Sequence, residues 1–200
     1  SLLLAADLYE QAKETERALG VYKRYMAYFP KPLDLALESR HKIALIYKAR
    51  NDSGAYINEL KQIMTQDAQA GRERTPRTRY LGATAALELT EPLYEQLVAI
   101  KLVKPFEKNL LKKRTAMKTA TDAFGKLVNY EVGDVTAAAT YYLAEIYYNF
   151  SRSLTESERP DNLNAEALEQ YELAIEEQAY PFEEKAIAVH EKNLGLLSVG

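Results

Sequence analysis

Few residues of the types that carry out catalysis occur at spacings that would assemble a site. The chain contains two histidines, His41 and His190, and no cysteine. Glu191 follows His190, but no second histidine lies four residues after His190, so the zinc-protease helix motif is absent. Without cysteine there is no thiolate metal site and no cysteine nucleophile. We therefore expect no metal ion, no cofactor and no enzymatic activity.

Acidic side chains are abundant, but they are not paired for acid–base chemistry. Adjacent glutamates such as Glu176 and Glu177 diverge by about 100° on a helix and do not share a site. Glycine-rich phosphate loops and the G-x-S-x-G nucleophile motif do not occur in the sequence. The chemistry of the side chains therefore favours binding over catalysis.

The amino-acid composition predicts a folded protein with many helix–helix interfaces. Apolar residues make up 47% of the chain, so it is neither disordered nor fibrous. Fifteen tyrosines occur with five phenylalanines and no tryptophan. Tyrosine suits positions where one end of the side chain is buried and the other is wet. No stretch of about eighteen apolar residues occurs, so we expect no transmembrane segment.

Charge is distributed unevenly along the sequence. Residues 101–130 carry eight basic and two acidic side chains, a balance of +6, and residues 131–200 carry fourteen acidic and four basic ones, a balance of −10. One interpretation is a set of solvated helix faces, and the other is a pair of oppositely charged docking surfaces. The basic docking surface would comprise Lys104, Lys108, Lys112, Lys113, Arg114 and Lys118. Because exposed aromatics do not alternate with these cations, we expect no specific nucleic-acid binding, and an acidic partner or an anionic membrane surface remains open.

Helical hairpins are the elements that must position these side chains. In residues 137–180, small residues and a large aromatic recur at helical spacing, which lets two antiparallel helices pack closely. The positions are Thr140, Leu143, Ala144 and Tyr147 in the first helix and Ala167 and Tyr171 in the second. The same spacing recurs at Leu2, Ala5, Ala6, Tyr9, Ala18 and Tyr22, then at Arg40, Ile43, Ala44 and Tyr47, and at Thr78, Leu81, Gly82 and Ala85.

These hairpins predict an all-α chain in four segments. Residues 1–71 form two hairpins, and residues 72–104 form a degenerate third one in which Pro92 begins the return helix. Residues 105–133 form one long basic spacer helix. Residues 134–200 form a hairpin with an enlarged turn at about 151–162 and a terminal helix that begins at Pro181. We expect the segments to stack as one continuous right-handed solenoid, and the chain to be a fragment of a longer protein.

The recurring spacing resembles the tetratricopeptide repeat, with its W-x2-L-G-x2-Y and A-x3-F helices. Tryptophan is absent, and Ala85 stands where the repeat has an aromatic residue. From about Phe106 to Asn193 the chain is also similar to the long tetratricopeptide-repeat envelope proteins of Gram-negative bacteria, which are related to gliding-motility proteins and to those found with TonB/ExbB/ExbD systems. That resemblance implies a non-catalytic scaffold in the periplasm or at the outer membrane; a cytoplasmic location is the alternative.

In stacked hairpins the first helix of each pair lines a concave groove, which predicts where a protein or peptide partner binds. The predicted groove residues are Asp7, Glu10, His41, Lys48, Tyr141, Glu145, Tyr148 and Asn149. Tyr141 and Tyr148 are the strongest candidates, because exposed aromatics supply contact area at low entropic cost. They would alternatively pack on a neighbouring hairpin. Two further functions are open, a structural spacer or oligomerisation segment and a regulatory subunit of an envelope transport or motility system; the partner and the oligomeric state stay undetermined.

Overall fold

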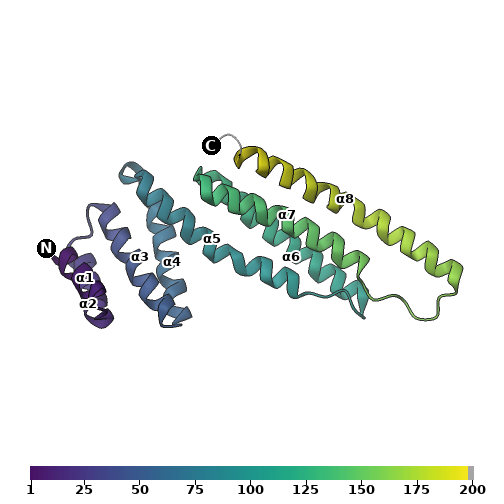
Figure 1. The fold of residues 1–200 in the computed structure, drawn as a ribbon, viewed down its shortest axis with the longest axis horizontal. Coiled ribbons are helices and arrows are strands. Elements are labelled where there is room, and N and C mark those ends of the chain that lie inside the picture. Colours follow the sequence, from purple (N-terminus) through teal and green to yellow (C-terminus); the bar gives the residue numbers. More distant parts are fainter. Residues whose placement is uncertain (198–200) are drawn as a thin grey trace. The chain divides into compact units, whose positions relative to one another are not determined.

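The computed structural model describes residues 1–197 and is all-helical, with 84% helix and no strand in that range. The helices form two compact units, Ser1–Leu89 and Thr90–Gly200, and the boundary between the units falls within α5. The α-helices are α1 (Leu2–Gln11), α2 (Thr15–Tyr28), α3 (Leu33–Ala49), α4 (Ser53–Gln69), α5 (Pro76–Ala99), α6 (Phe106–Leu127), α7 (Gly133–Thr155) and α8 (Ala165–Leu197), and two short 3₁₀ turns are η1 (Gly71–Glu73) and η2 (Val128–Tyr130) (Figure 1).

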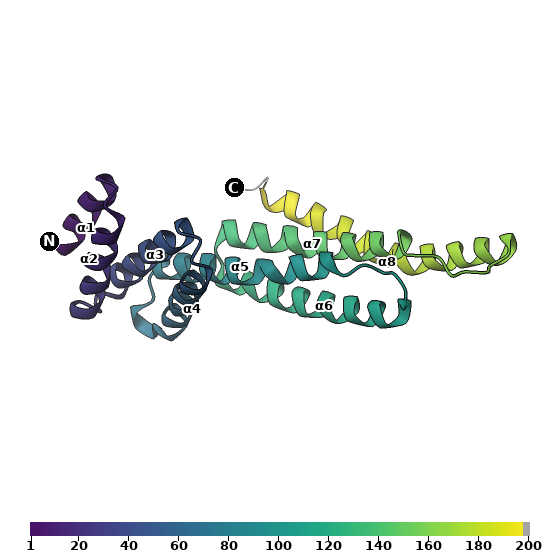
Figure 2. The same ribbon diagram turned by 90° about the horizontal axis from the view of Figure 1, so that it is seen from below.

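The first unit begins with two helical hairpins, α1–α2 and α3–α4 (Figures 1 and 2). Both hairpins use the same turn, in which one residue adopts the left-handed conformation. That residue is Lys13 in the first hairpin and Asn51 in the second, each with φ of 59°. The next residue in each turn donates its backbone N–H to the carbonyl of Tyr9 or Tyr47, at 2.8 and 3.0 Å. The two hairpins therefore repeat at the level of the backbone as well as in their sequence spacing.

Small and aromatic residues fill the core of the first unit. Ala6, Ala18 and Tyr22 pack with Ile43 and Ile46, which joins α1 and α2 to α3. A second cluster joins α3 and α4 to the start of α5, and it consists of Leu37, Ala44, Leu60, Ile63, Leu81 and Ala85. The residues that set the repeated spacing in the sequence are thus among those that bury apolar surface, which is the main favourable contribution to folding.

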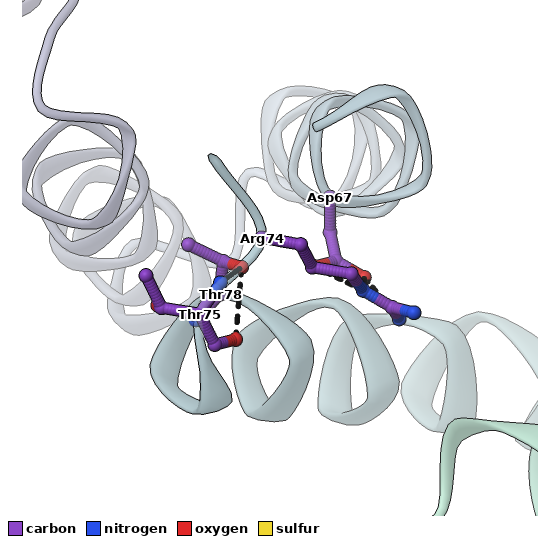
Figure 3. A network of polar contacts seen from close by, with 4 residues as sticks. All are labelled: Asp67, Arg74, Thr75 and Thr78. Atoms are coloured by element: carbon purple, nitrogen blue, oxygen red, sulfur yellow. Dashed lines mark hydrogen bonds and ion pairs between the residues drawn. The ribbon is translucent and has the colours of Figure 1, made fainter. Parts of the chain in front are cut away.

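A polar network fixes the start of α5 against α4 (Figure 3). Thr75 and Thr78 cap the helix reciprocally, since each backbone N–H donates to the other hydroxyl, at 3.0 and 3.1 Å. Arg74 donates hydrogen bonds from Nε and Nη2 to the carboxylate of Asp67, a fully buried residue of α4, and the shortest of these bonds is 2.7 Å. The two helices approach so closely that a Cβ at Gly82 would lie 2.7 Å from Asp67 Oδ2.

In the second unit, α7 packs against both α6 and α8 (Figures 1 and 2). The long helix α6 lies within the residues 105–133 for which the sequence predicts one basic helix. Its apolar face meets the other two helices in a core formed by Leu102, Leu110, Phe150, Leu154, Ile175 and Ala179. Phe150 and Phe182 of α8 lie with ring centroids 4.6 Å apart in this core.

Two predicted helix boundaries were wrong. Helix α5 runs without a break through Pro92, so the return helix of the degenerate hairpin at 72–104 is instead the second half of a single helix. Helix α8 likewise continues through Pro181 and merges the predicted terminal helix with the second helix of the hairpin in 134–200. Proline removes one backbone donor in each case, but both rings are exposed and the flanking turns supply their own hydrogen bonds.

The enlarged turn between α7 and α8 is shorter than predicted, because α7 extends to Thr155. Arg159 organises the turn by donating to the carbonyls of Ser157 and Thr155, at 2.7 and 2.9 Å. Asn164 then caps α8, its Oδ1 accepting from the backbone N–H of Ala167 at 2.8 Å. The turn is therefore tied to the end of α7 by its own side chains.

Candidate interaction surfaces

The predicted groove residues Asp7 and Glu10 are engaged within the first unit. The hydroxyl of Tyr22, on α2, is 3.1 Å from Asp7 Oδ1 and 3.0 Å from Glu10 Oε2. Lys42, on α3, also donates to Glu10 at 2.9 Å. Burial raises the pKa of Tyr22 above its ordinary value, and these two carboxylates raise it further. These acids link α1 to its neighbours, and this use competes with partner binding.

His41 and Lys48, both on α3, face the first half of α5 and are similarly engaged. Lys48 Nζ lies 2.8 Å from Glu88 Oε2 and 5.1 Å from the centre of the Tyr56 ring. His41 is half-buried near the Arg77–Glu38 ion pair, and its pKa is lowered mainly by burial. The structure therefore places all four predicted groove residues of this unit among interhelical polar contacts.

On α7 the predicted groove residues form one row along a single helix face. Tyr141 and Tyr148 are seven residues apart, and their exposed fractions are 48% and 46%. Glu145 lies between them at helical spacing and is half-buried, as is Asn149. The structure thus brings the four predicted residues of the second unit together, with both tyrosines available to solvent.

Tyr142, next to Tyr141 on α7, and two residues from other helices of the second unit join this row. Tyr142 stacks on Phe124 with centroids 4.7 Å apart, and its ring meets Tyr94 of α5 edge to face at 5.3 Å. His190 of α8 lies 5.9 Å from Tyr141 between ring centroids, and its Nε2 is 3.4 Å from Glu145 Oε1. We call Tyr94, Tyr141, Tyr142, Glu145 and His190 the tyrosine cluster; helices α5, α7 and α8 each contribute to it.

The tyrosine cluster is electrostatically negative. Burial raises the pKa of Tyr94, and the Glu145 carboxylate adds to the rise. Burial also raises the pKa of Tyr142, whose hydroxyl donates to Glu91 Oε1 at 3.2 Å. Within residues 1–197, no lysine or arginine forms an ion pair with Glu91, Glu95 or Glu145. The cluster therefore combines aromatic rings with nearby carboxylates that have no lysine or arginine as an ion-pair partner within residues 1–197.

Asn149 extends the row toward a depression of about 420 Å³. Its Oδ1 is buried and has no hydrogen-bond partner among the described residues. The depression is also lined by Lys101 and by Arg152, which pairs with Glu156 at 2.7 Å.

The predicted basic docking surface is only partly present. Lys113 was wrongly included, because its side chain is fully buried and its Nζ donates to the carbonyls of Leu97 and Ile100, at 3.0 and 2.9 Å. Lys104 pairs with Glu158 and Asp161, and Lys118 pairs with Asp122. Of the six predicted cations, Lys108, Lys112 and Arg114 are exposed and form no ion pair within residues 1–197, and they surround the exposed Leu111.

Sequence reasoning missed Tyr94 and Tyr142 as members of the cluster. Tyr142 directly follows a predicted groove residue, and its position on the adjoining face of α7 was the available signal. Nothing in the local sequence around Tyr94 indicates that it meets Tyr142, because that contact joins residues 48 positions apart through the packing of α5 on α7. His190 was considered only as a zinc ligand, and its contact with Tyr141 likewise joins distant parts of the chain.

Two general features of the described chain bear on its function. No group of three or more histidine, aspartate or glutamate side chains in residues 1–197 is arranged to hold a metal ion. None of the helices in that range is both long and apolar enough to cross a membrane. Comparison of the chain with models of protein families, with curated proteins and with solved structures yields no match.

Proposed function

We propose that this protein is a non-catalytic scaffold that binds a partner protein or peptide through the exposed row of α7. The observation that carries the proposal is the pair Tyr141 and Tyr148, which remain about half exposed on one helix face with Glu145 between them. Large exposed aromatics with few rotatable bonds are the side chains that most often dominate binding energy at protein interfaces.

The partner segment on this proposal carries lysine or arginine. The tyrosine cluster offers aromatic faces beside Glu91, Glu95 and Glu145, and in residues 1–197 these carboxylates form no ion pair with lysine or arginine. A cationic side chain placed there gains from both the ring quadrupole and the carboxylates. His190 at the edge of the cluster is the one described basic group close to Glu145.

The arrangement of helices that we propose is a tetratricopeptide-like right-handed solenoid. The identical turns at Lys13 and Asn51 and the buried small residues at the repeated positions support it. The location that we propose, from the family resemblance alone, is the periplasm or the outer membrane.

Affinity capture tests the proposal, with the 200-residue chain as bait in envelope and cytosolic extracts and mass spectrometry as the readout. Compared with wild type, Tyr148→Ala and the double variant Tyr148→Ala/Glu145→Ala should lose the same specific partners. Tyr148→Ala is the cleaner change, because Glu145 also contacts His190. Tyr28→Ala, which removes a tyrosine exposed to 69% on α2, is the matched control and should retain them.

Partners that both α7 variants retain would contradict binding through this row. Absence of any captured protein from either extract would favour the structural spacer instead. Circular dichroism of each variant should match wild type, since Tyr148 is about half exposed on the surface of α7.

A further inference from the structure

The outer face of α8 carries a row of large apolar side chains. Leu173, Tyr180, Ile187 and Leu194 follow one another at intervals of seven residues, and each is between 52% and 66% exposed. The opposite face of the same helix, with Ile175, Ala179 and Ala186, is buried. Within the second unit no described element covers the outer row, so α8 is apolar on two sides.

Glutamates flank this row on both sides. At the helical angle of about 100° per residue, Glu169, Glu176 and Glu183 lie on one side of the row, and Glu177, Glu184 and Glu191 lie on the other. All six are exposed. Lys185 is held near the rings of Tyr147 and Phe182, toward α7 and away from the row. The row therefore offers one apolar residue per heptad, half as many as a coiled-coil seam, between two lines of carboxylates.

We propose that the outer face of α8 docks a basic amphipathic helix of a partner protein. The partner helix would place apolar residues at intervals of seven against Leu173, Tyr180, Ile187 and Leu194, and lysine or arginine against the flanking glutamates. Apolar burial would supply affinity, and charge complementarity would select a basic helix over an acidic one. This surface is separate from the row on α7 and does not depend on the function proposed for that row.

A second copy of this chain fits the surface less well than a partner helix. The one long basic helix, α6, exposes Leu111, but the residues seven positions before and after it are Lys104 and Lys118. A copy of α6 therefore offers a single leucine to a row of four apolar residues. Pairing of two copies of α8 would bring their glutamates together, which is unfavourable.

A designed peptide tests the proposal on the full 200-residue chain. The probe is a helix of about four heptads with leucine every seven residues and lysine on both flanks; the control peptide has glutamate in place of each lysine. Fluorescence anisotropy should show binding of the lysine peptide and none of the glutamate peptide. The variant Tyr180→Ser/Ile187→Ser should weaken binding at least about tenfold, whereas Leu111→Ser on α6 should leave it unchanged.

A charge exchange separates docking from nonspecific attraction. Replacing all six flanking glutamates with lysine should reverse the preference, so that this variant binds the glutamate peptide and rejects the lysine peptide. Equal binding of the lysine peptide by wild type and Tyr180→Ser/Ile187→Ser would overturn the proposal, as would no binding at all. Self-association in analytical ultracentrifugation that Leu111→Ser abolishes would also overturn it, in favour of a second copy. Tyr148→Ala should bind the peptide like wild type, so this test and that of the α7 row fail independently.

Discussion

At the scale of single residues, Lys113 stands out because it is buried, whereas the cationic residues beside it in the sequence are exposed. It lies in a run of exposed cations, yet it shares helical spacing with Leu110, Met117 and Ala120 on the apolar side of α6. Its ammonium group is removed from water and donates to two carbonyls at the end of α5. The helical spacing could have predicted that Lys113 is buried. The carbonyls that accept its hydrogen bonds could not be predicted, because tertiary packing brings them there.

The buried ammonium predicts a specific pH dependence of stability. Burial lowers the pKa of Lys113 from 10.5 to about 8, and the charge of Lys101 acts in the same direction. Between these pH values the unfolded chain binds more protons than the folded chain, so stability rises with pH. Relative to Lys113→Met, wild type should gain about 2 kcal/mol of unfolding free energy between about pH 8 and pH 10. Urea denaturation followed by circular dichroism measures this difference.

Lys112→Met is the control for that experiment, because Lys112 is the exposed neighbour of Lys113. Its unfolding free energy relative to wild type should not change across the same pH range. A constant difference between wild type and Lys113→Met would show that Lys113 keeps an ordinary pKa in the folded chain. Work above pH 10 is avoided, because the raised pKa of Tyr22 makes stability fall there as tyrosines ionise in the unfolded chain.

At the scale of elements, the sequence predicted helices better where turns carry strong local signals. The hairpins α1–α2 and α3–α4 were predicted from apolar spacing, and the structure adds that Asp52 caps α4 directly after the left-handed Asn51. Pro92 and Pro181 were misinterpreted as helix starts, because proline is favourable in a first turn and tolerated in an exposed interior at a cost. Which of the two applies depends on packing on both sides of the proline, which no local pattern contains.

The close approach of α4 and α5 predicts that Gly82→Ala destabilises the first unit. Alanine normally favours a helix over glycine by about 1 kcal/mol. At Gly82 the new Cβ would lie 2.7–2.8 Å from atoms of Asp67, which is fully buried and held by Arg74. We expect the clash to outweigh the helix propensity and to lower the unfolding free energy by about 1–3 kcal/mol.

Gly20→Ala provides the matched comparison in the same unit. Gly20 is an exposed interior residue of α2, and a Cβ there meets nothing within 4 Å. This substitution should raise the unfolding free energy by up to about 1 kcal/mol. If thermal denaturation showed both glycine substitutions to be stabilising, the helices would be further apart at Gly82 than described.

At the scale of the whole molecule, acidic and basic side chains are concentrated in different segments of the chain. The segment 131–200, with a balance of −10, supplies α7 and α8 and hence most of the tyrosine cluster and the whole outer row of α8. Both proposed surfaces are acidic around apolar or aromatic centres. We therefore expect partner association to depend on ionic strength, mainly through the association rate.

Surface plasmon resonance with a captured partner measures this dependence. Raising the salt concentration from about 0.05 M to about 0.5 M should slow association several-fold, since charges on the two proteins are then screened beyond a few ångströms. The dissociation rate should change less, because buried aromatic contacts are insensitive to salt. Association that is independent of salt would assign recognition to apolar contacts alone.

Hydroxyl-radical footprinting with mass spectrometry tests whether Tyr141 and Tyr148 on α7 form the contact surface with a partner. The chain is labelled alone and with a partner recovered by affinity capture, and the modification of each tyrosine is compared. We predict that Tyr141 and Tyr148 become protected in the complex, while Tyr28, exposed to 69% on α2, is labelled equally in both states. Unchanged labelling of Tyr141 and Tyr148 in a saturated complex would contradict binding through this row.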